Sequence, residues 1–114
     1  MIKVPIKALS VNAAWQGRRF KTPAYEKFER DVLRLLPNTV DIPPGKLSLF
    51  IEFGYSNKLS DFDNGVKPLV DCLQKKYGFN DRNIKFAAIA INNDVKKGHE
   101  YFKFEISPVE DLIK

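Results

Sequence analysis

One segment near the middle of the chain alternates apolar and polar residues with a period of two. In "GKLSLFIEFGYS", residues 45–56, every second position from 47 to 55 is apolar: Leu47, Leu49, Ile51, Phe53 and Tyr55. Successive side chains of a strand point to opposite faces, so these five share one face. The pattern predicts a half-buried strand, and its apolar face requires a sheet covered by a second layer.

Three further segments are predicted strands. Residues 2–7 alternate apolar and basic side chains, and Pro5, which has no N–H, restricts this segment to a sheet edge or a strand end. Residues 84–91, "IKFAAIAI", predict a well-buried strand, and residues 99–106 alternate again. We expect the last two strands to form a hairpin whose connection is longer than a tight turn.

Two amphipathic helices lie between these strands. The first is predicted to start with Thr22 as N-cap and Pro23 at the first helical position, and to end before Pro37. Its apolar stripe contains Tyr25, Phe28, Val32, Leu35 and Leu36. The second carries Val66, Leu69, Val70 and Leu73 at helical spacing. Gly78 is its predicted stop, and Pro68 predicts an irregular or late start, because proline fits only a first turn.

These elements predict one small α/β (α+β) domain over residues 1–114. We expect a mixed sheet of about four strands, with two helices covering one face. An apolar content of 44% is enough for a core. The single cysteine, Cys72, excludes an internal disulfide and is expected in the core. With His99 as the only histidine, a Cys/His zinc site within one chain is also excluded.

The chain is basic, with 19 Lys and Arg against 14 Asp and Glu and a net charge of +5. Without Asp61, Asp63 and Asp81, 19 basic residues face 11 acidic ones, a net charge of +8. Such a surface attracts polyanions. The N-terminal residues contain no long apolar run, so we expect no signal peptide, no membrane partner and a cytoplasmic location.

The clustering of acidic residues in "LSDFDNGVKPL" on a basic chain therefore needs an explanation. If residues 61–63 are extended, the carboxylates of Asp61 and Asp63 point the same way, about 6–7 Å apart, and Phe62 points into the core. Two such carboxylates repel each other unless a cation lies between them. Mg²⁺ is the natural choice, because it takes oxygen ligands and keeps several waters. The alternative is an acidic turn in which Asp63 or Asn64 caps the next helix.

Lys67 and Asp81 are the other candidates. Lys67 follows Asp63 by four residues on one helix face, and it either binds the scissile phosphate or forms a surface ion pair. Asp71, four residues further on, could pair with Lys67 and support it. A helix of twelve residues is about 18 Å long, whereas residues 77–81 span at most about 17 Å. Asp81 therefore reaches the pair only if the chain doubles back along the helix. Otherwise a partner chain supplies this carboxylate, or Asp81 is an exposed loop acid.

The order and spacing of these residues resemble the RusA family of Holliday-junction resolvases. The matching features are Asp61-Phe62-Asp63-Asn64, then Lys67, then the helix "LVDCLQKKYGF", then Asn80-Asp81 before a strand. The likeness covers residues 50–91, and "SVNAAWQGRRFKTPAY" is similar to the Asn-containing loop of the family. Two features depart from the family: an amide, Asn80, replaces one acid of the acidic pair, and "GYSNKLS" replaces an arginine run before the first aspartate.

The resemblance implies a homodimeric, metal-dependent endodeoxyribonuclease that acts on branched DNA. Asp61, Asp63 and Asp81 would bind Mg²⁺, for which Mn²⁺ can substitute, and Lys67 would complete the catalytic set. Asn12, Arg18, Arg19 and Lys21 are the candidate DNA-binding residues. Trp15 and Phe20 either stack on unpaired bases or pack on the core.

We therefore expect the chain to resolve four-way DNA junctions in recombination and repair, in a bacterium or, if phage-encoded, in the host cytoplasm. Two alternatives remain open at this point: a phage nuclease for flaps or forks, and a non-catalytic module that binds branched DNA.

Overall fold

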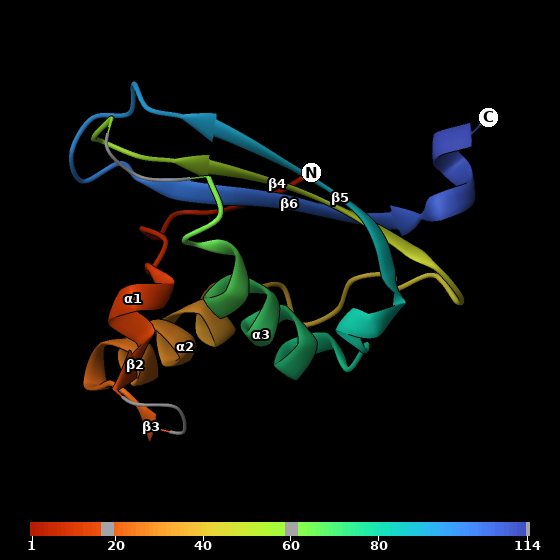
Figure 1. Ribbon diagram of the computed structural model, residues 1–114, viewed down its shortest axis with the longest axis horizontal. Helices are drawn as coiled ribbons and strands as arrows, with labels where there is room; N and C mark the ends of the chain where they lie inside the picture. Colours follow the sequence, from red (N-terminus) through yellow and green to blue (C-terminus); the bar gives the residue numbers. More distant parts are fainter. Residues whose placement is uncertain (17–19, 59–61, 114) are drawn as a thin grey trace.

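The computed structural model describes residues 1–16, 20–58 and 62–113. A four-stranded sheet is formed by β1 (Ile2–Val4), β6 (Tyr101–Pro108), β4 (Leu47–Gly54) and β5 (Ile84–Asn92), in that order. The helices α1 (Val11–Ala14), α2 (Pro23–Leu35) and α3 (Val66–Tyr77) lie below one face of this sheet (Figure 1). This arrangement confirms the predicted α+β class with a mixed sheet, and adds the short helix α1.

Smaller elements complete the chain. The two-residue strands β2 (Trp15–Gln16) and β3 (Phe20–Lys21) pair with each other beside α1 and α2. Two 3₁₀ turns follow, η1 (Asp81–Asn83) before β5 and η2 (Val109–Ile113) after β6. None of the helices in the described part of the chain is long and apolar enough to cross a membrane.

The predicted hairpin of the last two strands is wrong, because β4 lies between them. β4 pairs parallel with β5 and antiparallel with β6, and α3 makes the crossover from β4 to β5. Alternation identifies a segment as a strand but does not name its neighbour. β4 is the most buried strand, with six of its eight residues buried, and the centre of the sheet is where such a strand is covered on both edges.

The core lies between the sheet and α2 and α3. The predicted inner face of β4 is confirmed, since its five alternating apolar residues (Leu47, Leu49, Ile51, Phe53 and Tyr55) are all buried. Cys72 on α3 is fully buried, as expected, and burial raises the pKa of its thiol to about 12. Leu35 is the exception on the predicted stripe of α2, because its side chain is 41% exposed at the helix end while Leu36 packs inward.

The helix termini follow the predicted signals. The Thr22 side chain accepts a hydrogen bond from the Tyr25 N–H and caps α2, with Pro23 at its first position. Pro68 is the third residue of α3, within the first turn, where its missing N–H leaves no hydrogen bond unmade. Gly78 ends α3 with φ at 77°, a left-handed conformation that favours glycine.

β5 departs from the prediction of a well-buried strand. Its residues 85–87 are exposed, and the Phe86 side chain is 50% exposed. The reason is its place at the edge of the sheet, where no strand of the described chain covers its outer side. An apolar sequence thus predicted the strand correctly and its burial incorrectly.

Candidate metal and nucleic-acid site

The candidate site is built on α3 and the segments at its two ends. Asp63 lies in the turn before the helix, where its carbonyl oxygen accepts a hydrogen bond from the Val66 N–H at 3.1 Å. Asp61 lies outside the described residues, so the expected side-by-side arrangement with Asp63 is not defined. Residues 62–65 form a turn, and Phe62 is 63% exposed. The expectation that Phe62 anchors this segment in the core is wrong, because a turn does not follow the two-residue alternation of a strand.

The structure also bears on the capping alternative for Asp63. Gly65 occupies the N-cap position of α3, and no side chain caps the helix there. Among the described residues, the Asp63 carboxylate has neither a hydrogen-bond partner nor an ion pair, and its residue is exposed. It is therefore an open carboxylate near the N-terminus of α3, where the helix dipole stabilises negative charge.

Lys67 and Asp71 form the predicted ion pair one helical turn apart. The Lys67 ammonium lies 2.8 Å from Asp71 Oδ1, and the Tyr25 hydroxyl donates to Asp71 Oδ2 at 3.1 Å. The hydrogen bond to Asp71 is the main reason that the pKa of Lys67 is raised. Asp71 is in this way held from α2 and holds Lys67 in its charged form at the helix surface.

Asp81 returns towards the same face of α3. After the chain reverses at Gly78, the Asp81 N–H donates to Gln74 Oε1 at 3.0 Å. Gln74 follows Lys67 by seven residues and therefore lies two turns along the same helix face. The Asp81 carboxylate makes a further, smaller contribution to the raised pKa of Lys67. Asp81 therefore lies beside the last turns of α3, where the chain leaves the helix through η1 and enters β5 (Figure 1).

The donor atoms suit a hard divalent cation. Asp63 and Asp81 are exposed carboxylates, and neither makes an ion pair within the described part of the chain, so both keep their oxygens available. Carboxylate oxygens are the ligands that Mg²⁺ prefers. Within the described residues, no three acidic, histidine or cysteine side chains gather closely enough to hold a metal. The set predicted from sequence includes Asp61, which lies outside that part.

The candidate DNA-binding residues predicted from the sequence differ in their exposure and in their contacts. Lys21 is engaged, because its ammonium lies 2.7 Å from Glu29 Oε2 and 4.8 Å from the centre of the Tyr25 ring. Asn12 is exposed on α1, where its N–H donates to Ser10 Oγ. The remaining candidates, Arg18 and Arg19 and the side chains of Trp15 and Phe20, lie outside the described part of the structure.

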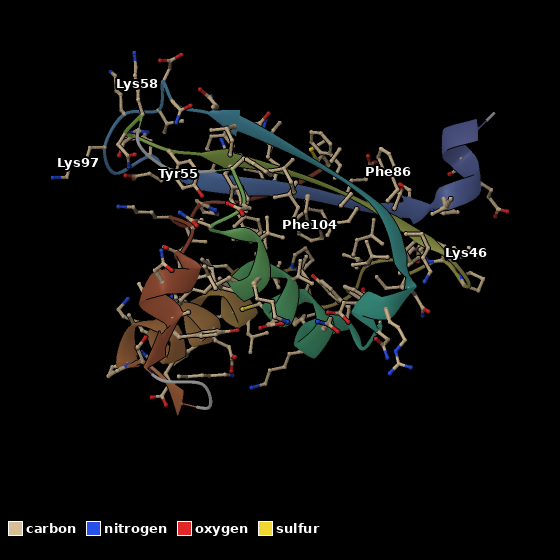
Figure 2. The ribbon with its side chains drawn as sticks, in the orientation of Figure 1. Lys46, Tyr55, Lys58, Phe86, Lys97 and Phe104 are labelled. Atoms are coloured by element: carbon tan, nitrogen blue, oxygen red, sulfur yellow. The ribbon has the colours of Figure 1, made fainter. Side chains whose placement is uncertain are left out.

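The fold gathers a group of lysines at one end of the sheet, of which sequence reasoning identified only Lys96 and Lys97 as possible phosphate-binding residues. Lys58 follows β4, Lys96 and Lys97 lie between β5 and β6, and Lys7 follows β1; all four are exposed. Figure 2 shows Lys58 and Lys97 beside Tyr55 at this end, and Lys46 at the opposite end. Asn93 Nδ2 donates to the Asn57 carbonyl at 2.8 Å and joins the two loops. Only the "KK" at 96–97 signals the group in the sequence.

Comparison with known proteins gives no further assignment. No protein-family model matches the chain, and neither does any curated protein. The function must therefore be inferred from the geometry and chemistry of the described residues.

Proposed function

We propose that the protein is a Mg²⁺-dependent endodeoxyribonuclease that cuts branched DNA, with the four-way junction as its substrate. The observation that carries the proposal is the contact of Asp81 with Gln74, which lies two turns from Lys67 on the same face of α3. Asp63 precedes the same helix. Open carboxylates at the two ends of α3 and a fixed ammonium between them, on a chain with a net charge of +5, supply ligands for a metal ion and a binding group for phosphate.

Each residue has a role in this proposal. Asp61, Asp63 and Asp81 would hold the metal, which when bound lowers the pKa of a water and polarises the phosphate. Lys67 would bind a non-bridging phosphate oxygen and stabilise the charge that develops on it. Asp71 and Tyr25 are positioning residues, because they keep the Lys67 ammonium charged and aimed along the helix surface.

We further propose that the protein acts as a homodimer, because resolving a symmetric junction takes two incisions and a C2 dimer has two active sites. The outer edge of β5 supports this proposal. The Tyr55 N–H donates to the Asn92 carbonyl, so the backbone groups of residue 92 face β4. By alternation those of residues 91, 89 and 87 face outward. This edge is long and apolar, and lacks the prolines and inward-pointing charges that protect natural edges.

An antiparallel pairing of two β5 strands about Ala88 fits this edge. It would set Phe86 opposite Ala90 of the second copy on the open face of the sheet, a large side chain against a small one. It would also set Ala87 opposite Ile89 on the helix face. The two copies of Lys85 would lie far apart, so no like charges would meet. The joined sheet would carry both candidate sites. We propose that the dimer acts on its DNA substrate in the cytoplasm.

The test is cleavage of a synthetic four-way junction in magnesium, with linear duplex and forked DNA beside it and every nick mapped. We expect cuts in the junction, and loss of cleavage by about a hundredfold or more in Asp61→Asn and in Asp81→Asn, the scale on which single charge-stabilising groups act. Junction binding should persist or improve in both, because each removes a negative charge from the DNA surface.

Asp41→Asn is the matched control. Asp41 is exposed beside Ile2 and Phe104, at the opposite edge of the sheet from β5. The Asp41→Asn variant should therefore cleave the junction as fast as the unaltered protein does. Preferential cutting of the fork would favour the flap or fork nuclease. Binding without any cutting would leave only a branched-DNA binding module.

A further inference from the structure

A cavity of about 430 Å³ lies beside the candidate site. One wall is the N-terminal segment 7–13, the floor is Tyr55 at the end of β4, and the other wall contains Asn57 and Asn64. The walls are joined by a hydrogen bond of 2.7 Å from the Val11 N–H to the Asn64 carbonyl. The cavity is therefore formed by main-chain segments that are tied together, and its volume lies within the range of about 300–1,000 Å³ typical of ligand pockets.

The position of this cavity links it to the candidate metal ligands. Asn64, which lines it, is the next residue after Asp63. Asn12, a candidate DNA-binding residue from the sequence, lies between two lining residues, Ser10 and Ala13. A strand whose phosphate lies at a metal ion held by Asp63 would therefore have its neighbouring nucleotide at the mouth of the cavity.

The lining combines the two chemistries that a nucleotide requires. Ala8, Leu9 and Ala13 provide apolar walls, and the Tyr55 ring is fixed by stacking on Phe53, with ring centres 5.7 Å apart. An apolar lining favours a base, whose faces are poorly hydrated, although the Tyr55 ring is itself buried, with 4% exposure. Polar groups stand around it: the Lys7 ammonium, the Ser10 hydroxyl and the amide side chains. Burial raises the pKa of Tyr55 to about 12, so its hydroxyl stays protonated at neutral pH.

Lysines lie at the end of the sheet where the cavity opens, and one of them, Lys7, lines it. The loop that carries Lys96 and Lys97 is held against the end of β4, where the Val95 N–H donates to the Tyr55 carbonyl at 3.3 Å. Lys58 lies at the same end of the sheet (Figure 2). Lys7, which lines the cavity, makes no direct ion pair in the described part of the chain, although its charge helps to lower the pKa of Glu100. Its ammonium is therefore a candidate to bind a phosphate. This end therefore attracts a nucleic-acid backbone.

We propose that this cavity seats one unpaired nucleotide of the DNA substrate, with the base between the apolar walls and its phosphate at Lys7. This inference rests on the proposed function and deepens it, because it names how a branch point is distinguished from regular duplex. A base that is paired and stacked within a duplex cannot leave it to enter the cavity, whereas a base released at a junction or fork can.

The test uses a single-stranded thymidine dinucleotide as the probe, in EDTA, so that no cleavage occurs. Binding is measured by ligand-observed NMR, with inorganic phosphate as competitor. We expect Ala13→Phe to weaken binding about tenfold or more, because it fills the cavity from an exposed helix position. Lys7→Ala should also weaken binding, whereas Lys46→Ala, at the opposite end of the molecule (Figure 2), should not. Equal melting temperatures would establish that all variants fold.

The outcomes separate this inference from the nuclease proposal. Undiminished dinucleotide binding by Ala13→Phe would overturn the cavity assignment, as would no detectable binding by the unaltered protein. Complete displacement by equimolar inorganic phosphate would overturn the base-binding role and leave a phosphate site. If dinucleotide binding depends on Ala13 and Lys7 in a protein that cuts no DNA, the nucleotide-binding role of the cavity would be supported and the nuclease proposal would be contradicted.

Discussion

At the scale of single residues, the packing of Gly54 against Tyr101 makes a sharp prediction. A Cβ atom at Gly54 would lie 2.2 Å from Tyr101 Cε1. The ring cannot easily move away, because its hydroxyl donates to Glu52 at 2.6 Å and accepts from Asn92 at 3.2 Å. Gly54→Ala should therefore lower the free energy of unfolding by about 1–3 kcal/mol, the usual cost of overpacking, as measured by urea denaturation.

The cause of this loss can be isolated by a double variant. If the clash with the ring is responsible, adding Tyr101→Ala should make the effect of Gly54→Ala much smaller than it is in the unaltered background. Equal effects in both backgrounds would contradict the steric explanation. Gly45→Ala is no substitute control, since Gly45 has a φ of 84° and would be strained for a different reason.

Residue-level predictions from sequence succeeded where a local rule determined the outcome. Thr22 capped its helix, Gly78 ended its helix, and Lys67 paired with Asp71, because each depends on residues within four positions. Phe62 was predicted wrongly because the strand rule was extended into a turn. The direction of the chain after Gly78, and hence the position of Asp81, depends on tertiary packing and could not be decided from spacing alone.

At the scale of elements, strand identity was predictable and strand order was not. The apolar sequence of β5 suits both an interior and an edge strand, and the connections left open whether it pairs with β4 or β6. For a related reason, only Lys96 and Lys97 of the lysine group had a signal in the sequence. The members of the group come from loops that become neighbours only because β4, β5 and the start of the chain end at the same side of the sheet.

The proposed β5 interface makes the element-level prediction. Ala88→Lys would bring two ammonium groups together at the two-fold axis, and like charges directly opposite on paired strands are destabilising. We expect this variant to be monomeric in sedimentation velocity, and Ala88→Glu likewise. An equimolar mixture of the two should recover the dimer, because opposite charges then meet across the axis.

Two results would contradict this interface. If the unaltered protein is monomeric at micromolar concentration, the homodimer proposal itself would be contradicted. A dimer that persists in both single variants would show that another surface forms it. Unchanged melting temperatures would establish that each variant retains its fold, since Ala88 lies on the open face and not in the core between sheet and helices.

At the scale of the whole molecule, charge is distributed unevenly. The open carboxylates at the two ends of α3 are opposed by lysines gathered at one end of the sheet. Such an arrangement draws the phosphate backbone towards the lysines, and each neutralised phosphate releases counterions. Binding strength is therefore a property of the surface as a whole, whereas cleavage depends on a few oxygens.

This separation predicts the salt dependence of junction binding in EDTA. The affinity should fall steeply between about 50 and 200 mM salt, with a logarithmic slope of about 0.9 for each phosphate that the protein neutralises. The double variant Lys96→Gln, Lys97→Gln should flatten the slope by about 1–2, because one or two phosphates are then left without a cation. Lys46→Gln, remote from the lysine group in Figure 2, should leave the slope unchanged.

Fluorescence anisotropy of a labelled junction measures the affinity of all three proteins at each salt concentration. A slope that is equal in all of them would show that DNA crosses the molecule elsewhere, and an affinity that ignores salt would remove the electrostatic argument altogether.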